Sequence, residues 1–420
     1  MGARRPDRRN FLKGSAAMAG GLTLGAVEPV LGQTTTPSGG FIKGNEELVL
    51  YGERSQHVTS VRMAHPPAGR PSPDAYGKYF HIAAPLQDSV GTITPSSLHF
   101  VGTTRGSFIP DIDPQEHRLM IHGMVDRPLT FTMEDLKRLP SETRPHFIEC
   151  AGNRSRPQYK TVQETHGMTS CAEWTGVPLS LLLKEAGIKD SAPWIVCEGE
   201  EEVKGASSIP MVKAMDDCLV AYGMNGEAVR PQNGFPLRLL VPGFEGIFNT
   251  KYLRRIKVVD RYYMTYNDYG HLNRRDDEVG AALGMLIGPK SVITFPSGGQ
   301  QLPDRGFYEV SGLAWSGGGA ISKVEVSTDG GRRWADAEIR GGAHPMSHTR
   351  FSYQWTWDGQ EAELLSRCTD DTGQIQPTRA QIAEFFGERA DDESFRVRGM
   401  DNSIQPWRIA SDGSVHNAIT

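Results

Sequence analysis

The chain has 420 residues, which at roughly 100–200 residues per domain predicts two or three domains. Its 45 basic and 50 acidic side chains give a net charge of −5, which argues against a nucleic-acid-binding protein because such proteins normally carry a basic face. The sequence contains no run of about 18 apolar residues, so we expect no membrane-spanning helix. Its 47 glycines and 27 prolines favour a strand- and loop-rich fold over a helical bundle.

The amino-terminal segment predicts export. Residues 8–13 read Arg-Arg-Asn-Phe-Leu-Lys and precede a Gly/Ala-rich apolar stretch, 14–27, that is too short to span a bilayer. Paired arginines in this setting are typical of a twin-arginine signal, whereas the glycines disfavour the alternative, an amphipathic first helix. We therefore assign residues 1–32 to a signal peptide of a periplasmic protein that is exported folded. That route favours an enzyme loaded with its cofactor in the cytoplasm over a simple binding module.

The rest of the chain divides by texture. Residues 33–95 are irregular and rich in Pro, Gly and His, which predicts a linker and an arm. Residues 96–285 alternate loosely between strand and helix patterns and predict an α+β domain. Its expected elements are a strand at 118–123, a helix at 133–137 capped by Thr132, a strand at 146–150, a helix at 179–184 ending at Gly187, and a buried strand at 235–243.

Residues 286–420 predict an immunoglobulin-like antiparallel β-sandwich, because short β-rich runs follow one another at near-regular spacing. These runs are 291–295, 307–315, 321–327 and 351–357, with a tight turn at 329–331, a helix over about 377–390 and a last strand near 407–409.

Cys150 is the best candidate for chemistry among five cysteines, an odd number for an exported chain. It ends an apolar strand, and the nearby Arg154 and Arg156 should favour its thiolate, a soft metal ligand. A buried structural thiol is the alternative, and the spacing alone leaves both open. The chain has neither a CxxC pair nor CxxCH, so we expect no zinc ribbon and no c-type haem on this chain. Buried thiols are the default for the other four, which are Cys171, Cys197, Cys218 and Cys368.

Residues 149–154, Glu-Cys-Ala-Gly-Asn-Arg, resemble the metal-ligand motif of the sulfite oxidase family of molybdoenzymes. Motifs at 207–210, 234–243 and 370–377 support the resemblance, which covers nearly all of the mature chain. It implies a molybdopterin-binding α+β domain followed by an immunoglobulin-like dimerisation domain. Residues 103–113 and 266–272 are most similar to the molybdenum subunits of sulfane dehydrogenases of bacterial thiosulfate oxidation.

The resemblance also implies roles for single residues. Cys150 would bind molybdenum, which is held by a plain molybdopterin, and Arg105 would face an anionic substrate. Tyr269 would be the active-site tyrosine, although Tyr266 stays open as an alternative, and a lone His271 is more simply structural. Contacts to the cofactor would come from Asn233, Arg238, Asn249, Thr250 and Lys251; a solvated surface charge is the alternative for Lys251.

The implied activity is oxidation of the sulfane sulfur carried on a cysteine of a sulfur-carrier protein, with electrons passing to a separate c-type cytochrome subunit. The chain would form a homodimer within a heterotetramer. Three departures from the family pattern reduce charge near the pocket and weaken the case for free sulfite: Ser155 between two arginines, Asn233 for a histidine, and Gly106-Ser107 for Asn-His. Alternatives are a sulfite:cytochrome c oxidoreductase, a methionine sulfoxide reductase, which residues 290–420 disfavour, and a metal-free partner-binding scaffold.

Overall fold

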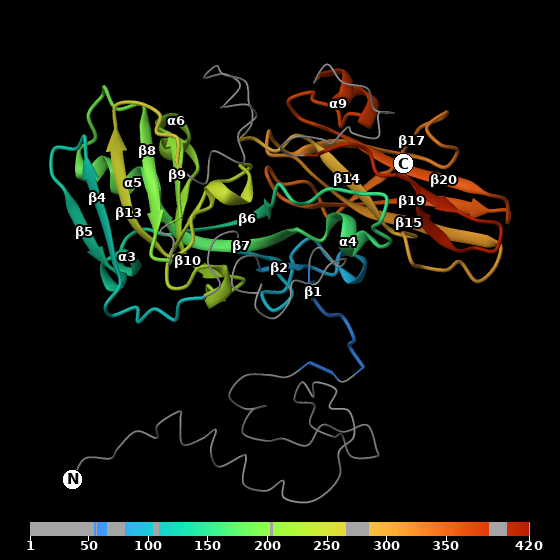
Figure 1. Ribbon diagram of the computed structural model, residues 1–420, viewed down its shortest axis with the longest axis horizontal. Helices are drawn as coiled ribbons and strands as arrows, with labels where there is room; N and C mark the ends of the chain where they lie inside the picture. Colours follow the sequence, from blue (N-terminus) through green and yellow to red (C-terminus); the bar gives the residue numbers. More distant parts are fainter. Residues whose placement is uncertain are drawn as a thin grey trace, which may run out of the picture. The chain divides into compact units, whose positions relative to one another are not determined.

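The computed structural model describes residues 54–55, 57–64, 80–103, 109–201, 205–265, 285–385 and 401–419 (Figure 1). The chain separates into two units, Met1–Thr59 and Ser60–Thr420, and every element given below lies in the second. The expected signal segment, 1–32, lies outside the described residues.

The α+β region contains three sheets, a small one of three strands and two larger ones of five strands each. The small sheet has the order β1 (Met63–Ala64), β2 (Phe80–Ala83), β3 (Val101–Thr103). The second has the order β11 (Glu227–Ala228), β10 (Leu219–Met224), β7 (Thr169–Pro178), β6 (Glu142–Glu149), and β12 (Arg238–Leu240) also pairs with β10. The third has the order β5 (Leu129–Thr132), β4 (Arg118–Gly123), β13 (Leu253–Val259), β8 (Trp194–Gly199), β9 (Ala206–Pro210), with β4 and β13 parallel.

Short helices connect these strands, and their ends follow local signals. Thr132 caps the first of them through the backbone N–H of Asp135, whose carboxylate accepts from the backbone N–H of Thr132 in return. Gly187 ends another in the left-handed region at φ 68°. The helices are α3 (Met133–Arg138), α4 (Val162–His166), α5 (Leu179–Ala186) and α6 (Met211–Asp216), with 3-10 turns at Leu86–Asp88, Pro231–Asn233 and Gly246–Phe248. No helix within the described ranges is long and apolar enough to cross a membrane.

The carboxy-terminal region is the predicted β-sandwich. Along β20, buried and partly exposed residues alternate, as expected for a strand with one face toward a core. One sheet has the order β14 (Lys290–Phe295), β15 (Gly306–Trp315), β19 (Thr349–Trp357), β18 (Glu338–Arg340). The other has the order β17 (Ala335–Asp336), β16 (Ile321–Ser327), β20 (Ala362–Asp370), β21 (Trp407–Ile409), β22 (Val415–Asn417), and α9 covers Arg379–Phe385.

Two predicted elements differ from the observed ones. The strand expected at 146–150 begins earlier, at Glu142, and ends at Glu149, so Cys150 is the first residue of the following loop. The strand expected at 235–243 is reduced to β12, because Pro236 and Pro242 have no N–H to donate to a ladder.

One hydrophobic cluster contains residues of both regions. Phe147 on β6 and Val162 on α4 pack in the same cluster as Trp315 and Trp407 of the sandwich. The backbone N–H of Phe147 also donates to the carbonyl of Met346, at 3.0 Å. The end of β6 is therefore fixed against the sandwich immediately before Cys150.

Candidate active site

Cys150 lies in a loop whose backbone is tied down on both sides. Its N–H donates to the carbonyl of Met168 at 3.0 Å, and its carbonyl accepts from the N–H of Asn153 at 2.9 Å. The N–H of Gly152 points at the sulfur, with 3.4 Å between N and Sγ. Cys150 is partly exposed, whereas Cys171, Cys197, Cys218 and Cys368 are buried, and all five are free thiols. Cys150 is thus the one thiol that a ligand can reach.

Arg154 favours the Cys150 thiolate, as expected from its place in the sequence, but opposing effects outweigh it. Burial, together with the nearby Glu245 carboxylate, raises the pKa of Cys150 to about 12. The guanidinium of Arg154 opposes this only weakly, because it folds back to donate to the carbonyl of Ala151 at 3.0 and 3.2 Å. A bound metal cation is the agent that would deprotonate this thiol.

Arg238, on β12, is the centre of a second group of predicted site residues. It is 4% exposed, and its Nη1 and Nη2 donate to the carbonyls of Asn233 at 2.7 Å and Asn249 at 3.2 Å. Its guanidinium lies over the ring of Trp174, 4.8 Å from the centroid. Burial lowers the pKa of Arg238 to about 10, which is still above neutrality, so the group is a buried cation at pH 7.

Lys251 belongs to the same group and is not the solvated surface charge that was the alternative. Its Nζ donates to the carbonyls of Gly102 at 3.0 Å and Gln232 at 3.3 Å. Burial lowers the pKa of Lys251 to about 8. One buried cation, Arg238, and one partly buried cation, Lys251, are therefore held by backbone carbonyls of the same region.

Three buried polar atoms of this group have no hydrogen-bond partner within the part of the chain that the structure describes. They are Nε of Arg238, Oδ1 of Asn233 and Oγ1 of Thr250. Buried polar atoms without partners are destabilising by about 1–3 kcal/mol each, so such a set indicates a polar ligand that supplies the missing bonds. Together with the cations of Arg238 and Lys251, these donors and acceptors fit an anionic polar cofactor.

The segment 245–251 connects this group to the loop of Cys150. Asn249 donates to the carbonyl of Glu245 at 3.2 Å, and the Oε1 of Glu245 accepts from the N–H of Ala151 at 3.3 Å. The two backbones approach so closely that a Cβ on Gly246 would lie 2.9 Å from the carbonyl oxygen of Glu149. The structure thus brings the candidate metal ligand close to the segment that carries the candidate cofactor-binding residues Asn249, Thr250 and Lys251.

Sequence reasoning missed His99, which lies among these residues. It is 1% exposed, its Nδ1 is 3.3 Å from Nδ2 of Asn233, and its Nε2 has no partner among the described residues. Burial lowers the pKa of His99 to about 3, so the ring is neutral. A single histidine outside any motif gives no indication in the sequence that it will lie beside the candidate cofactor-binding residues. Six residues that the sequence singled out lie outside the described residues, namely Arg105, Gly106, Ser107, Tyr266, Tyr269 and His271.

Comparison with family models defines the class of protein. Residues 106–267 match the oxidoreductase molybdopterin binding domain, residues 285–398 match the Mo-co oxidoreductase dimerisation domain, and residues 5–25 match the twin-arginine translocation signal sequence. The chain is therefore a molybdopterin oxidoreductase of the periplasm, as predicted.

Comparison with individual proteins shows which family within this class the chain resembles. The chain is 34% identical to a chain in the crystal structure of the sulfane dehydrogenase SoxCD from Paracoccus pantotrophus, covering 89% of this chain and 99% of that one with a TM-score of 0.73. It is 31% identical over 325 residues to mitochondrial sulfite oxidase of Rattus norvegicus, and 33% identical over 355 residues to NADH nitrate reductase 1 of Arabidopsis thaliana. These alignments include 68% and 72% of the chain but only 57% and 38% of the two relatives. The chain belongs to the sulfite oxidase family, and the predicted order of a molybdopterin domain and an immunoglobulin-like sandwich is confirmed.

Proposed function

We propose that this chain is the molybdenum subunit of a periplasmic sulfane dehydrogenase. It would oxidise sulfane sulfur on a carrier protein and pass the electrons to a c-type cytochrome subunit. The observation that carries the proposal is the similarity to the SoxCD chain, which extends over 99% of that chain. The similarity to sulfite oxidase and nitrate reductase covers the same kind of domain at comparable identity, so the family alone does not select the substrate.

In this proposal Cys150 would bind molybdenum, and Arg238 and Lys251 would hold the phosphate or the ring of the pterin. Bound molybdenum would supply two-electron oxygen-atom transfer to sulfur. The chain would supply the rest: the Gly152 N–H directed at Sγ would stabilise a thiolate, and the cations of Arg238 and Lys251 would balance the cofactor's charge. Asn233, Asn249 and Thr250 would complete the cofactor contacts.

Arg105 and Tyr269 are proposed as the residues that touch the substrate. A guanidinium at Arg105 would hold the anionic oxosulfur group and stabilise charge that develops on it. The hydroxyl of Tyr269 would hydrogen-bond to the transferred oxygen or move a proton. Comparing Tyr269→Phe with Tyr266→Phe tests the assignment, because only the variant of the active tyrosine should lose turnover.

The domain limits 96–285 and 286–420, the homodimer formed through the sandwich and the heterotetramer with the cytochrome also belong to the proposal. The model of the dimerisation domain supports an oligomer of this kind. Sedimentation of the purified enzyme with and without the cytochrome subunit tests the stoichiometry directly.

A sulfite:cytochrome c oxidoreductase is the second candidate, favoured by the 31% identity to sulfite oxidase. Steady-state assays of the molybdenum-loaded protein with a c-type cytochrome separate the two. We expect fast turnover with the sulfur-loaded carrier protein and slow turnover with free sulfite; fast turnover of free sulfite without the carrier would overturn our preference. Elemental analysis excludes a metal-free scaffold if the wild type carries molybdenum and Cys150→Ser does not bind it normally.

A further inference from the structure

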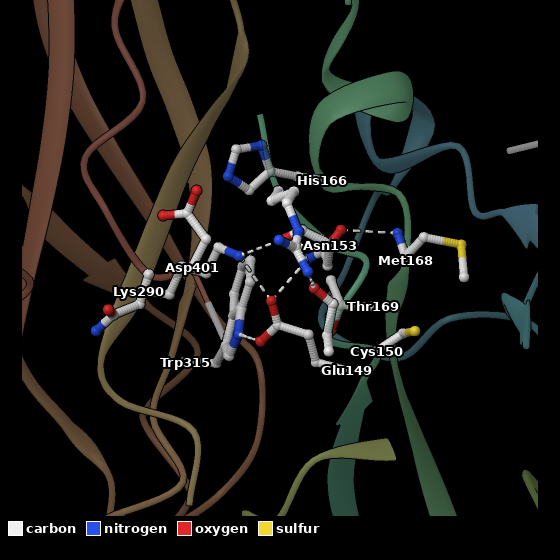
Figure 2. Close-up of polar contacts among 12 residues, drawn as sticks. Glu149, Cys150, Asn153, His166, Met168, Thr169, Lys290, Trp315 and Asp401 are labelled. Atoms are coloured by element: carbon white, nitrogen blue, oxygen red, sulfur yellow. Dashed lines mark hydrogen bonds and ion pairs between the residues drawn. The ribbon is translucent and has the colours of Figure 1, made fainter. Parts of the chain in front are cut away.

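Glu149, the residue before the candidate metal ligand, lies in a fully enclosed polar cluster (Figure 2). The exposed fractions are 0% for Glu149, 1% for Lys290 and 0% for Trp315. Lys290 Nζ lies 2.7 Å from Glu149 Oε1, and Trp315 Nε1 donates to Glu149 Oε2 at 2.7 Å. Asn153 Nδ2 donates to Oε1 at 2.8 Å, so both carboxylate oxygens are occupied.

The same cluster holds the other end of the ligand loop. Lys290 Nζ also donates to the carbonyl of Asn153 at 2.6 Å, and Asn153 Oδ1 accepts from the N–H of Met168 at 2.9 Å. The backbone N–H of Asn153 in turn donates to the carbonyl of Cys150. Residues on both sides of Cys150 are therefore bound to one buried ammonium group.

The two donors from the sandwich form a matched pair. Lys290 begins β14 and Trp315 ends β15, and the two residues are directly opposite each other in the antiparallel ladder. Cross-strand neighbours lie about 4.5–5.5 Å apart at Cβ, so one register fixes both side chains at once. The sandwich thus places two hydrogen-bond donors in a fixed arrangement against one carboxylate of the molybdopterin domain.

A buried ion pair adds little to the net stability of a fold, because desolvation of the two charges offsets their attraction. Apolar side chains of similar volume would stabilise the same site equally well. What a fully hydrogen-bonded pair does provide is fixed geometry. We propose that Lys290 and Trp315 are positioning residues, which act through Glu149 to set the orientation of the Cys150 side chain toward the metal. This inference rests on the proposed role of Cys150 as a metal ligand.

The test compares two substitutions of the same type in the same hydrophobic cluster. Trp315→Phe removes the indole donor to Glu149. Trp407→Phe is the matched control, because Trp407 is equally buried and its indole N–H donates to a backbone carbonyl, that of Ile293, at 3.1 Å. Lys290→Met adds a stronger perturbation, and the comparison of the two Trp variants remains decisive if that protein does not fold.

Two measurements report on Cys150. The first is the rate of alkylation of Cys150 in cofactor-free protein, corrected by the rate for Cys150→Ser. The second is the molybdenum paramagnetic resonance signal and the thiolate-to-metal absorption of loaded protein, which depend on cysteine orientation. We expect Trp315→Phe to speed alkylation by about fivefold or more and to shift the spectra, because a loosened loop exposes the thiol. Trp407→Phe should lower the melting temperature while both properties stay as in the wild type.

The inference is overturned if the two Trp variants lose similar thermal stability and both keep wild-type alkylation rates and spectra. The cluster would then be structural only. Failure of the proposed function is separate from this result: it would be seen as a wild-type protein without molybdenum, or as normal metal binding by Cys150→Ser. The alkylation rates of the cofactor-free chain still measure whether the cluster positions the cysteine.

Discussion

Arg238→Met should affect the cofactor-free and the loaded protein very differently. In the cofactor-free chain, the buried guanidinium makes no ion pair with any described residue. Lowering of its pKa from 12.5 to about 10 means that burial disfavours the charged form by roughly 3 kcal/mol. Methionine removes this penalty but leaves the carbonyls of Asn233 and Asn249 without a donor, at about 1–3 kcal/mol each. The two effects largely offset each other, so we expect the free energy of unfolding to fall by no more than about 3 kcal/mol.

In the loaded protein the same substitution removes a buried cation from an anionic group. Loss of one member of a buried charged pair costs roughly 2–5 kcal/mol, which corresponds to about 30-fold or more in affinity. The stabilisation that the cofactor adds, measured as the difference in urea midpoint between loaded and cofactor-free protein, should therefore shrink markedly.

Arg367→Met is a suitable control, because Arg367 also lies over a tryptophan ring, that of Trp334 at 4.3 Å, but in the sandwich and paired with Glu325. It should leave the added stabilisation unchanged. If Arg238→Met instead lowers the stability of the cofactor-free chain by more than about 4 kcal/mol and leaves the cofactor's contribution intact, the arginine is structural and the reasoning fails.

Three further results are expected. Between pH 8 and 10.5 the unfolded chain binds more protons at Lys251 than the folded chain. Lys251 should therefore raise the free energy of unfolding by roughly 2–3 kcal/mol as the pH increases across that window. Urea titrations of Lys251→Met should lack this rise. Burial lowers the pKa of His146 to about 4, so the free energy of unfolding should fall as the pH drops from 6.5 toward 4. His146→Asn should make this dependence on pH shallower by up to about 1.4 kcal/mol per pH unit. An unchanged dependence on pH would contradict this. Gly243→Ala should destabilise the fold by about 2–4 kcal/mol in thermal melts, because φ is +76° and the new Cβ would lie 2.4 Å from the carbonyl oxygen of Gly317. Gly226→Ala is the control, since Gly226 has a similar φ of +77° but no atom near the new Cβ. It should lose only about 1–2 kcal/mol.

The parts of the fold that the sequence predicted well are those set by neighbours in the chain. The Thr132–Asp135 capping box and the left-handed Gly187 mark helix ends within a few residues, and both ends lie where the patterns indicate. The sandwich strands were predicted from short β-rich runs at near-regular spacing, and the observed strands contain these runs. The start of β6 at Glu142 was missed because a strand's length depends on its partner β7, which the local pattern does not contain.

The site was predicted in part, for a similar reason. Motif resemblance located Cys150, Arg238 and Lys251, but it gave no information on what surrounds them. Lys290 is the clearest case: a lysine between proline and serine at the start of a strand is typical of a solvated charge. It is buried because the ladder sets it opposite Trp315 and against Glu149, which is 141 residues away.

The ionisation of Cys150 shows how such distant contacts can reverse a conclusion drawn from adjacent residues. Counting Arg154 and Arg156 predicted a thiolate, but a charge acts on a thiol only through the medium between them, and here burial dominates. The carboxylate that adds to the effect, Glu245, is 95 positions further along the chain and reaches the loop through the N–H of Ala151. Since the protein alone holds the thiol protonated, tight ligation requires a cation strong enough to displace the proton. Metal binding at this site should therefore release a proton near neutral pH, and the loop, already fixed by Gly152 and Asn153, need not rearrange to receive the metal.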